Sequence, residues 1–415
     1  MEFGAILRVA VRALARNKMR SVLTMLGIII GSRRGDLQCR RRAEQARPRR
    51  ARALAVLVRS NSNYMEETMK KLCVFGFVLA LVITLAVCQS KQPSAPESAA
   101  PAAEATPPLV LTQSVSLAGV KGRFDHFASG KGRVFVSGLG NNTVEVIDLF
   151  QGTLAHEIPN VPNPQGVAFS PDANKLFVAS EKDKLYVFDG DSYKQLAAID
   201  FDGGADNLRY DAATKRVYVG CGDDEKTSAI AIVDAMTNQR IDEYKIGGEP
   251  ESFQLEKSGP NIYVNIPDLK QIAVINRNTK AITRWSLTVA QNFPMALDEA
   301  DHRLLVGTRE PATLSVFDTS SGKMIASIPA VQDSDDLYYS AEHKRIFMPG
   351  REGAIWVFQQ KDPDHYELLA KIPTALGAGT AGYFGRQGKG FDRFYLAVPA
   401  RGNEPAEMRI YSVQD

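Results

Sequence analysis

Short hydrophobic runs of strand length recur along the chain from residue 109 onward, and each ends on a polar residue. The clearest are "VEVID", "LYVFD", "IAIVD", "IAVIN", "LSVFD", "IWVFQ" and "MRIYS", whose last residues are spaced by 41, 45, 42, 42, 41 and 53 positions. A repeat near 42 residues built from strand-like segments is typical of propeller blades, each of which is one small sheet. The pattern therefore predicts seven such units.

Each unit offers four strand-like segments, as the second copy shows with "QGVAFS", "KLFVAS", "LYVFD" and "LAAIDF". The second and third segments are almost continuously apolar, which is expected for strands covered on both faces by neighbouring sheets. We therefore predict an all-β fold, a seven-bladed β-propeller with four-stranded blades. The aspartates that end four of the third segments are expected to accept backbone N–H bonds in the following turns; they are Asp148, Asp189, Asp234 and Asp318.

The two ends of the repeat region predict how the ring closes. The seventh unit stops at "EMRIYSVQD" without a fourth strand, whereas residues 109–119, "LVLTQSVSLAG", precede the first unit. We expect this segment to pair with the C-terminal strand, which removes the open sheet edges. Residues 377–390 are rich in glycine and account for the long last spacing. We interpret them as a longer surface connection, with a mobile loop at the channel rim as the alternative.

An export signal precedes the repeats at residues 65–88. From Met65 or Met69 the chain continues through two lysines into an apolar run and then Cys88, the order of a secretory signal. The end of this run, "LAVC", resembles a lipoprotein signal, which implies that Cys88 is lipidated. An uncleaved anchor and a cleaved, soluble form are the alternatives, and all three place the body in the periplasm or cell envelope. Residues 89–108 are a Pro/Ala-rich linker.

Residues 1–64 have a different character. Their opening, "MEFGAILRVAVRALARNKMRSVLTMLGIIIG", resembles the start of MacB-type ABC transporter permeases, but the arginines after Gly31 interrupt the apolar run. We interpret residues 1–64 as a frameshifted permease fragment or a mistaken upstream start, with a basic arm as the alternative. A complete permease is excluded for residues 109–415, which contain no further apolar run long enough to span a membrane.

Charge is divided unevenly along the 415 residues. The net charge is +3, yet residues 1–71 carry 17 Lys and Arg against 5 Asp and Glu, so the remainder is net negative. Generic nucleic-acid binding relies on clustered basic residues and is not expected of this body. Cys221 is the one cysteine in the repeats, without a partner for a disulfide or a CxxC zinc motif. We expect it to be a small buried side chain.

The repeats resemble the YVTN-type (YncE-like) β-propellers of bacteria. The resemblance rests on "RVYVG", "NIYVN", "GNNTVEVIDLFQG" and "IAIVDAMTNQRI" and covers residues 109–415. It implies an exported propeller, from a family whose roles are varied, and we expect a monomer. Since one fold serves many activities, the function has to be sought in the site.

Polar residues at the starts of the first strands are the candidates for that site, because these starts meet at one mouth of the central channel. They are Arg123, Asp125, His126, Gln165, Asp206, Asn207, Glu251, Asn292, Asp335 and Asp336. Such a ring suits calcium, or a polyhydroxylated or cationic ligand. The candidate calcium ligands are Asp125, Asp206, Asn207, Glu251 and Asp335.

Two functions follow from this ring. The first is an exported, membrane-tethered scaffold that binds a ligand or protein without catalysis. The alternative is a divalent-metal-dependent hydrolase, because the residue types of the ring resemble the calcium-centred channel of propeller lactonases. In that hydrolase His126 and its neighbour Asp125 would perform acid–base work. No nucleophile elbow, P-loop or dinucleotide fingerprint is found in the sequence.

Overall fold

The computed structural model describes residues 106–387 and 391–415. The expectations for residues 1–64, for the export signal at 65–88 with Cys88, and for most of the 89–108 linker lie outside this range. Over the range it describes, no helix combines the length and the hydrophobicity needed to cross a membrane.

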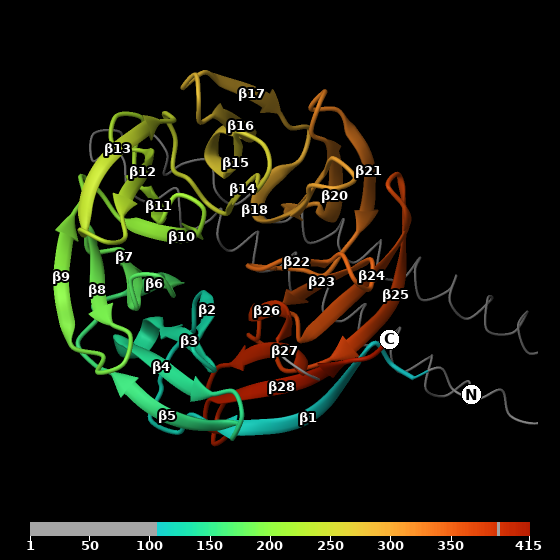
Figure 1. Cartoon of the computed structure of the whole chain (residues 1–415). Helices are drawn as coiled ribbons and strands as arrows, with labels where there is room; N and C mark the ends of the chain where they lie inside the picture. The colour runs from blue at the N-terminus through green and yellow to red at the C-terminus, as the bar shows by residue number, and fades with distance from the viewer. Residues whose placement is uncertain (1–105, 388–390) are drawn as a thin grey trace, which may run out of the picture. The chain divides into compact units, whose positions relative to one another are not determined.

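Seven antiparallel sheets of four strands each form a ring around a central channel (Figure 1). This confirms the predicted all-β, seven-bladed propeller. In each of the first six blades the chain runs from the channel outward through four consecutive strands, so that the first strand lines the channel and the fourth lies at the rim. Residues far apart in sequence therefore meet along the channel wall.

The strands group by their position in the blade. The first strands are β2 (Phe127–Gly130), β6 (Pro164–Ser170), β10 (Ala205–Asp211), β14 (Phe253–Leu255), β18 (Ala290–Asp298), β22 (Tyr338–Ser340) and β26 (Thr380–Gln387). The second strands are β3 (Arg133–Gly138), β7 (Lys175–Ser180), β11 (Arg216–Cys221), β15 (Asn261–Ile266), β19 (Arg303–Glu310), β23 (Arg345–Gly350) and β27 (Phe391–Val398). The third strands are β4 (Thr143–Asp148), β8 (Lys184–Asp189), β12 (Ala229–Asp234), β16 (Gln271–Asn276), β20 (Ala312–Asp318), β24 (Ala354–Asp362) and β28 (Glu407–Val413). The outer strands are β5 (Thr153–Ile158), β9 (Gln195–Asp200), β13 (Gln239–Lys245), β17 (Ile282–Ser286), β21 (Met324–Pro329), β25 (His365–Pro373) and β1 (Leu109–Ser116), and two short 3-10 turns, η1 (Leu139–Asn141) and η2 (Pro267–Leu269), follow β3 and β15.

The hydrophobic core lies between neighbouring blades, as the apolar second and third strands predict. Phe135 of β3 is fully buried, and its ring stacks on Phe169 of the next blade with centroids 5.7 Å apart. Outer strands such as β9 alternate between exposed and partly buried positions instead. Cys221 is buried and unpaired, as expected. The interdigitation of neighbouring blades positions the first strands rigidly around the channel.

The turn aspartates behave as predicted. Asp148 accepts the backbone N–H groups of Phe150 and Gln151 at 2.8 and 2.9 Å. These backbone bonds, that of Gln151 first, lower the pKa of the Asp148 carboxyl. Asp234 makes the equivalent pair of bonds to Met236 and Thr237. The repeated aspartate is therefore a structural residue of the hairpin and not part of a site.

Ring closure follows the prediction from the two chain ends. β1 pairs antiparallel with β28 from Leu109–Val413 to Ser116–Glu407, with one shift of register between Leu111 and Gln113. The seventh blade therefore consists of three C-terminal strands and one N-terminal strand, β1-β28-β27-β26 (Figure 1).

The glycine-rich segment differs from its interpretation as a surface connection, because Thr380–Gln387 within it forms the channel strand β26. At Gly382 the absent side chain leaves room for a close contact with the neighbouring blade. A Cβ on Gly382 would lie 3.0 Å from the ring of Phe127 in the adjacent blade.

Candidate functional site

A cavity of about 290 Å³ lies at the channel mouth where the first strands begin; we call it the narrow cavity. Most of the predicted ring lines it, namely Arg123, Asp125, His126, Gln165, Asp206, Asn207, Glu251 and Asp335. Asp336 instead lines a second cavity of about 670 Å³ further along the channel, the wide cavity. Asn292 lines neither, because its buried amide donates to Asn265 Oδ1 and to the Gln271 carbonyl at 2.9 and 3.0 Å.

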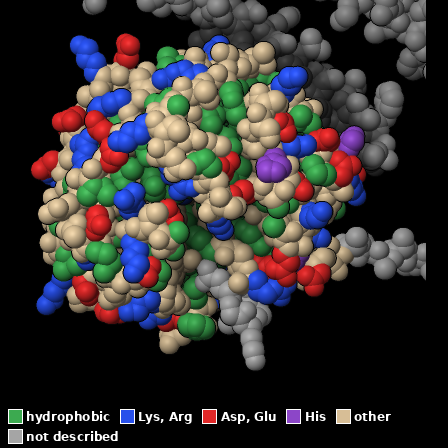
Figure 2. Space-filling model, turned by 45° about the horizontal axis from the view of Figure 1, so that its top comes forward, with side chains coloured by type: hydrophobic (Ala, Val, Ile, Leu, Met, Phe, Trp, Pro, Cys, Tyr) green, Lys and Arg blue, Asp and Glu red, His purple; other side chains and the backbone are tan. Residues whose placement is uncertain are grey.

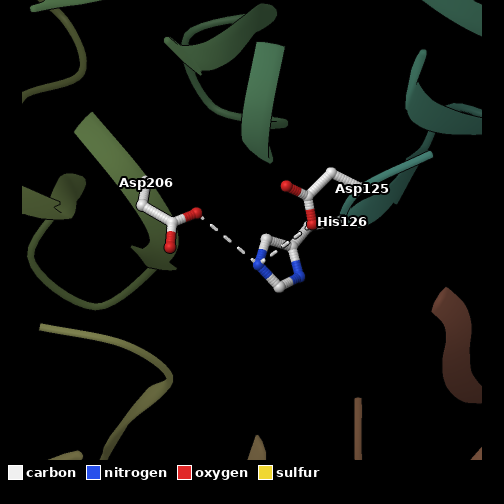
Figure 3. Close-up of side chains that lie close together, drawn as sticks. All are labelled: Asp125, His126 and Asp206. Carbon is white, nitrogen blue, oxygen red and sulfur yellow. Dashed lines mark ion pairs between the residues drawn. The ribbon is translucent and has the colours of Figure 1, made fainter. Parts of the chain in front are cut away.

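His126 lies between carboxylates from three parts of the ring. Its Nε2 is 3.6 Å from Asp125 Oδ1 and 3.7 Å from Asp206 Oδ1, and Figure 3 shows the imidazole of His126 between these two acids. Its Nδ1 is 3.3 Å from Asp336 Oδ1. The segment before β2 is fixed by the backbone, since the Asp125 N–H donates to the Ser137 carbonyl at 2.9 Å. His126 therefore stands at a defined place in the channel.

The surrounding carboxylates hold His126 in its charged form. Burial disfavours the imidazolium, but Asp125, Asp336 and Asp206 outweigh it and raise the pKa of His126 to about 10. Burial, together with Asp206 and Asp335, raises the pKa of Asp125 to about 7 against the opposing effect of His126. Burial also raises the pKa of Asp206. At neutral pH both ring nitrogens therefore carry protons that face carboxylates.

Two arginines that the sequence analysis did not select occupy one side of the narrow cavity. Arg351 donates to Asp333 Oδ1 at 3.1 Å and to Asp335 Oδ1 at 3.0 Å, and Arg309 pairs with the same two aspartates. The guanidinium of Arg309 also lies 3.8 Å from the centroid of the Phe293 ring. Both arginines follow or end a second strand, in "TRE" and "GRE" of successive repeats. That recurrence was a sequence signal for them, because second strands end at the same mouth where first strands begin.

The opposite side of the narrow cavity is acidic. Glu181 and Asp223, after β7 and β11, and Glu249 and Glu251, before β14, line it together with Asp206. Burial, followed by the neighbouring carboxylates, raises the pKa values of Glu249 and Glu251, the latter well above its usual range. The cavity is therefore polarised. Blades two to four contribute acids that have no arginine or lysine partner among the described residues, and blades five and six contribute ion-paired arginines.

The geometry assembles only part of the candidate calcium set. Asp125, His126 and Asp206 offer ligand atoms within 4.8 Å of one another, whereas Glu251 and Asp335 do not belong to that group. Asn207 Oδ1 faces Arg209 Nη1 at 3.4 Å. Calcium takes six to eight oxygen ligands, but this group supplies two carboxylates and one imidazole nitrogen.

Comparison with solved structures places this channel in a known fold. Residues of the chain superpose on a chain from the crystal structure of a mitotic checkpoint complex with a TM-score of 0.61 at 14% identity, covering 79% of this chain and 98% of that one. The crystal structure of the RRP9 WD40 repeats matches with a TM-score of 0.57 at 10% identity, covering 68% of this chain and 91% of that one. A chain of Kuenenia stuttgartiensis hydrazine synthase matches with a TM-score of 0.57 at 14% identity, covering 67% of this chain and 94% of that one.

The chain has a WD40-like propeller fold. No family model and no curated protein matches the sequence. At identities of 10 to 14% the likeness concerns the fold alone. On the face shown in Figure 2, acidic and basic side chains are interspersed, without a continuous basic patch of the kind that binds phosphates.

Proposed function

We propose that this chain is an exported, membrane-tethered, YncE-like propeller that acts as a binding scaffold, and that its narrow cavity holds a small organic cation such as an amine. Propeller channels are rigid and present side chains from every blade to one point. The export signal and linker in the sequence support placement in the cell envelope. The proposal for the ligand rests on the charges of the narrow cavity.

The observation that carries it is the pair Glu249 and Glu251. Neither carboxylate makes an ion pair or a side-chain hydrogen bond within the part of the chain that the structure describes. Asp206 Oδ1 has no hydrogen-bond partner there either, although His126 Nε2 lies 3.7 Å from it. Glu249 is exposed at the mouth, whereas Glu251 and Asp206 are partly buried. Carboxylates that repel one another across one cavity and have no arginine or lysine partner favour a ligand that brings positive charge and N–H donors.

The size of the narrow cavity favours an organic cation over a bare ion. Oxygens that share one calcium ion lie within about 5 Å of one another, since each is 2.3–2.6 Å from the metal. Glu251 does not share the close group formed by Asp125, His126 and Asp206. A volume of about 290 Å³ accommodates several non-hydrogen atoms. An ammonium group can be contacted by acids on different blades without all of them converging on one point.

The hydrolase alternative has less support in this geometry. Its acid–base residue, His126, has both nitrogens directed at carboxylates and a raised pKa. A protonated imidazole donates hydrogen bonds, and it must lose a proton before it can ligate a metal or accept a proton from water. We therefore propose binding without catalysis.

The test is calorimetric titration of the full-length protein with butylamine and 1,4-diaminobutane. Neutral 1,4-butanediol and calcium chloride serve as comparison ligands. We expect saturable binding of an amine, weakened about tenfold or more by Glu251→Gln because a charged hydrogen bond is lost. Glu352→Gln is the matched control, since it removes an exposed carboxylate that does not line the cavity.

Three results would overturn the proposed ligand. The first is no saturable heat with either amine, and the second is equal binding of the diol. The third is calcium binding that requires Glu251 while the amines have no effect, which would replace the organic cation with a metal site. The export part has its own test: labelling with a radioactive fatty acid should be lost in Cys88→Ser if the anchor is a lipid.

A further inference from the structure

The wide cavity has a chemistry of its own. It continues from the narrow cavity along the first strands, and His126, Ser252 and Asp335 line both. Polar and apolar side chains line it in similar measure; the larger apolar ones include Phe127, Phe169, Leu208, Leu255, Met295 and Phe384. With about 670 Å³ it is large enough for a ring-containing small molecule.

The carboxylates that line the wide cavity are already satisfied by the protein. Asp335 pairs with Arg309 and Arg351, and Asp336 accepts from His126 and from the Ala381 N–H. Glu299 accepts the Lys257 and Ser258 N–H groups at 2.8 Å, and Asp298 accepts the Gln360 amide at 3.0 Å. No acid of this cavity therefore requires an outside cation.

The cationic side chains that line the wide cavity, in contrast, have no acidic partner in direct contact. Arg209 projects from β10 and donates to the Leu208 carbonyl at 2.7 Å and, more weakly, to Asn207 Oδ1 and Ser252 Oγ at 3.4 and 3.3 Å. Within the described residues, neither Arg209 nor Lys257 forms an ion pair with a carboxylate, although Asp336 and Asp206 act on Arg209 from a greater distance.

The environment makes this unpaired charge costly. The guanidinium of Arg209 lies 5.3 Å from the centroid of the Phe253 ring, and burial lowers its pKa. An arginine nevertheless remains protonated in proteins. An enclosed guanidinium whose hydrogen bonds go only to neutral oxygens retains the capacity to bind an anion, preferably one with two oxygens in a plane.

We propose that the wide cavity is a second binding site, for a small organic acid whose apolar or aromatic body packs on the channel wall and whose anionic group pairs with Arg209. The apolar lining supplies binding energy without orientation, and Arg209 fixes which end of the ligand lies deepest. Lys257, an exposed residue two positions after β14, adds a positive charge at the same cavity. The charged residues proposed to bind the ligand differ from those of the amine site, although His126 and Asp335 line both cavities.

The test uses the full-length protein and three probes: benzoate, phenylacetate and phenyl phosphate. Benzamide and phenylacetamide serve as neutral analogues of the first two. We expect at least one anion to bind saturably by calorimetry, and its neutral analogue about tenfold or more weakly. Arg209→Gln should cause a loss of similar size, while Arg216→Gln in the same blade, whose side chain does not line the cavity, should bind as the unchanged protein does.

A second measurement applies if Arg209→Gln fails to fold, as judged by circular dichroism. Photo-crosslinking of the unchanged protein with benzophenone-4-carboxylate should label peptides containing β10 or β14, and excess probe should compete. Failure of all three anions to bind at about 10 mM would overturn the proposal. Binding unaffected by Arg209→Gln, or crosslinks confined to other strands, would also overturn it. A preference among the three probes distinguishes a carboxylate from a phosphate ligand.

Discussion

Asp336 ties His126 to the last blade of the ring. Its Oδ1 lies 3.3 Å from His126 Nδ1, and its Oδ2 accepts the N–H of Ala381 in β26 at 2.8 Å. The segment that enters the first blade is thus connected through the channel to the seventh blade, in addition to the outer pairing of β1 with β28. The same contact neutralises a carboxylate that burial would otherwise leave unpaired.

Replacing His126 should destabilise the fold by removing the cation shared by three acids. We expect His126→Gln to lower the free energy of unfolding by about 3 kcal/mol near neutral pH, because buried carboxylates lose their partner. The folded-state pKa of His126 is raised from 6.5 to about 10. Its contribution is therefore complete below pH 6.5 and lost as the pH rises toward 10. Urea unfolding at pH 6 and pH 9 measures this difference.

His365→Gln is the control for that experiment. His365 also faces an aspartate, with Nδ1 2.8 Å from Asp362 Oδ1, but both side chains are exposed. An exposed pair contributes little, so we expect a change below about 1 kcal/mol. If His126→Gln destabilised equally at pH 6 and pH 9, His126 would act through packing and not through charge.

The closure of the ring predicts a large effect at Leu117. This side chain is fully buried in the cluster between the first and seventh blades, and its N–H donates to the Ala406 carbonyl at 2.8 Å. Leu117→Ala should cost about 2–5 kcal/mol, because a cavity forms where the two chain ends meet. Leu111→Ala, on the same N-terminal segment but 48% exposed, should cost less than about 1 kcal/mol. Equal effects in thermal unfolding would mean that β1 contributes little to closure.

Gly382 gives a test of the contact between β26 and β2. Its missing side chain lets the ring of Phe127 approach to 3.0 Å from the position of a Cβ. Gly382→Ala should destabilise the protein by about 1–3 kcal/mol through overpacking. Adding Phe127→Leu should recover part of that loss if the clash is the cause, and a double-mutant cycle measures the coupling. Additive losses would place the strain elsewhere.

The fold could be predicted from the sequence because each blade is specified by a local pattern of apolar and polar residues. The run ending at Asp148 and its later copies specify a strand, a turn and a period, and the surplus strand at residues 109–116 specifies closure. Only the glycine-rich segment was misinterpreted. Gly382 there packs closely against Phe127, a contact between residues more than 250 positions apart that no local pattern reveals.

The candidate site could be predicted only in part from the sequence. Strand starts located His126 and its acids, but the ends of the second strands supply Arg309 and Arg351 at the same mouth. Asn292 was selected by its position, yet β18 carries a register irregularity between Asn292 and Met295, and the amide is turned into the core. Which charges pair and which stay unpaired, as Arg209 does, depends on side-chain geometry across blades.

Glu145 provides the clearest prediction for the dependence of stability on pH. It is fully buried in β4, accepts a hydrogen bond from Thr143 at 2.6 Å, and has a second oxygen, Oε2, without a hydrogen-bond partner in the described residues. Burial, aided by the opposing Glu157, raises its pKa from 4.5 to about 7. The folded state therefore binds a proton that the unfolded state releases, and stability is lost as the pH rises from 4.5 through 7.

Glu145→Gln keeps the shape and removes the charge, so it should stabilise the protein at pH 8 by about 1–3 kcal/mol and have little effect at pH 4.5. Thermal unfolding at the two pH values decides the matter, since a Glu145→Gln protein that is less stable at pH 8 would show that the ionised carboxylate is satisfied in the fold.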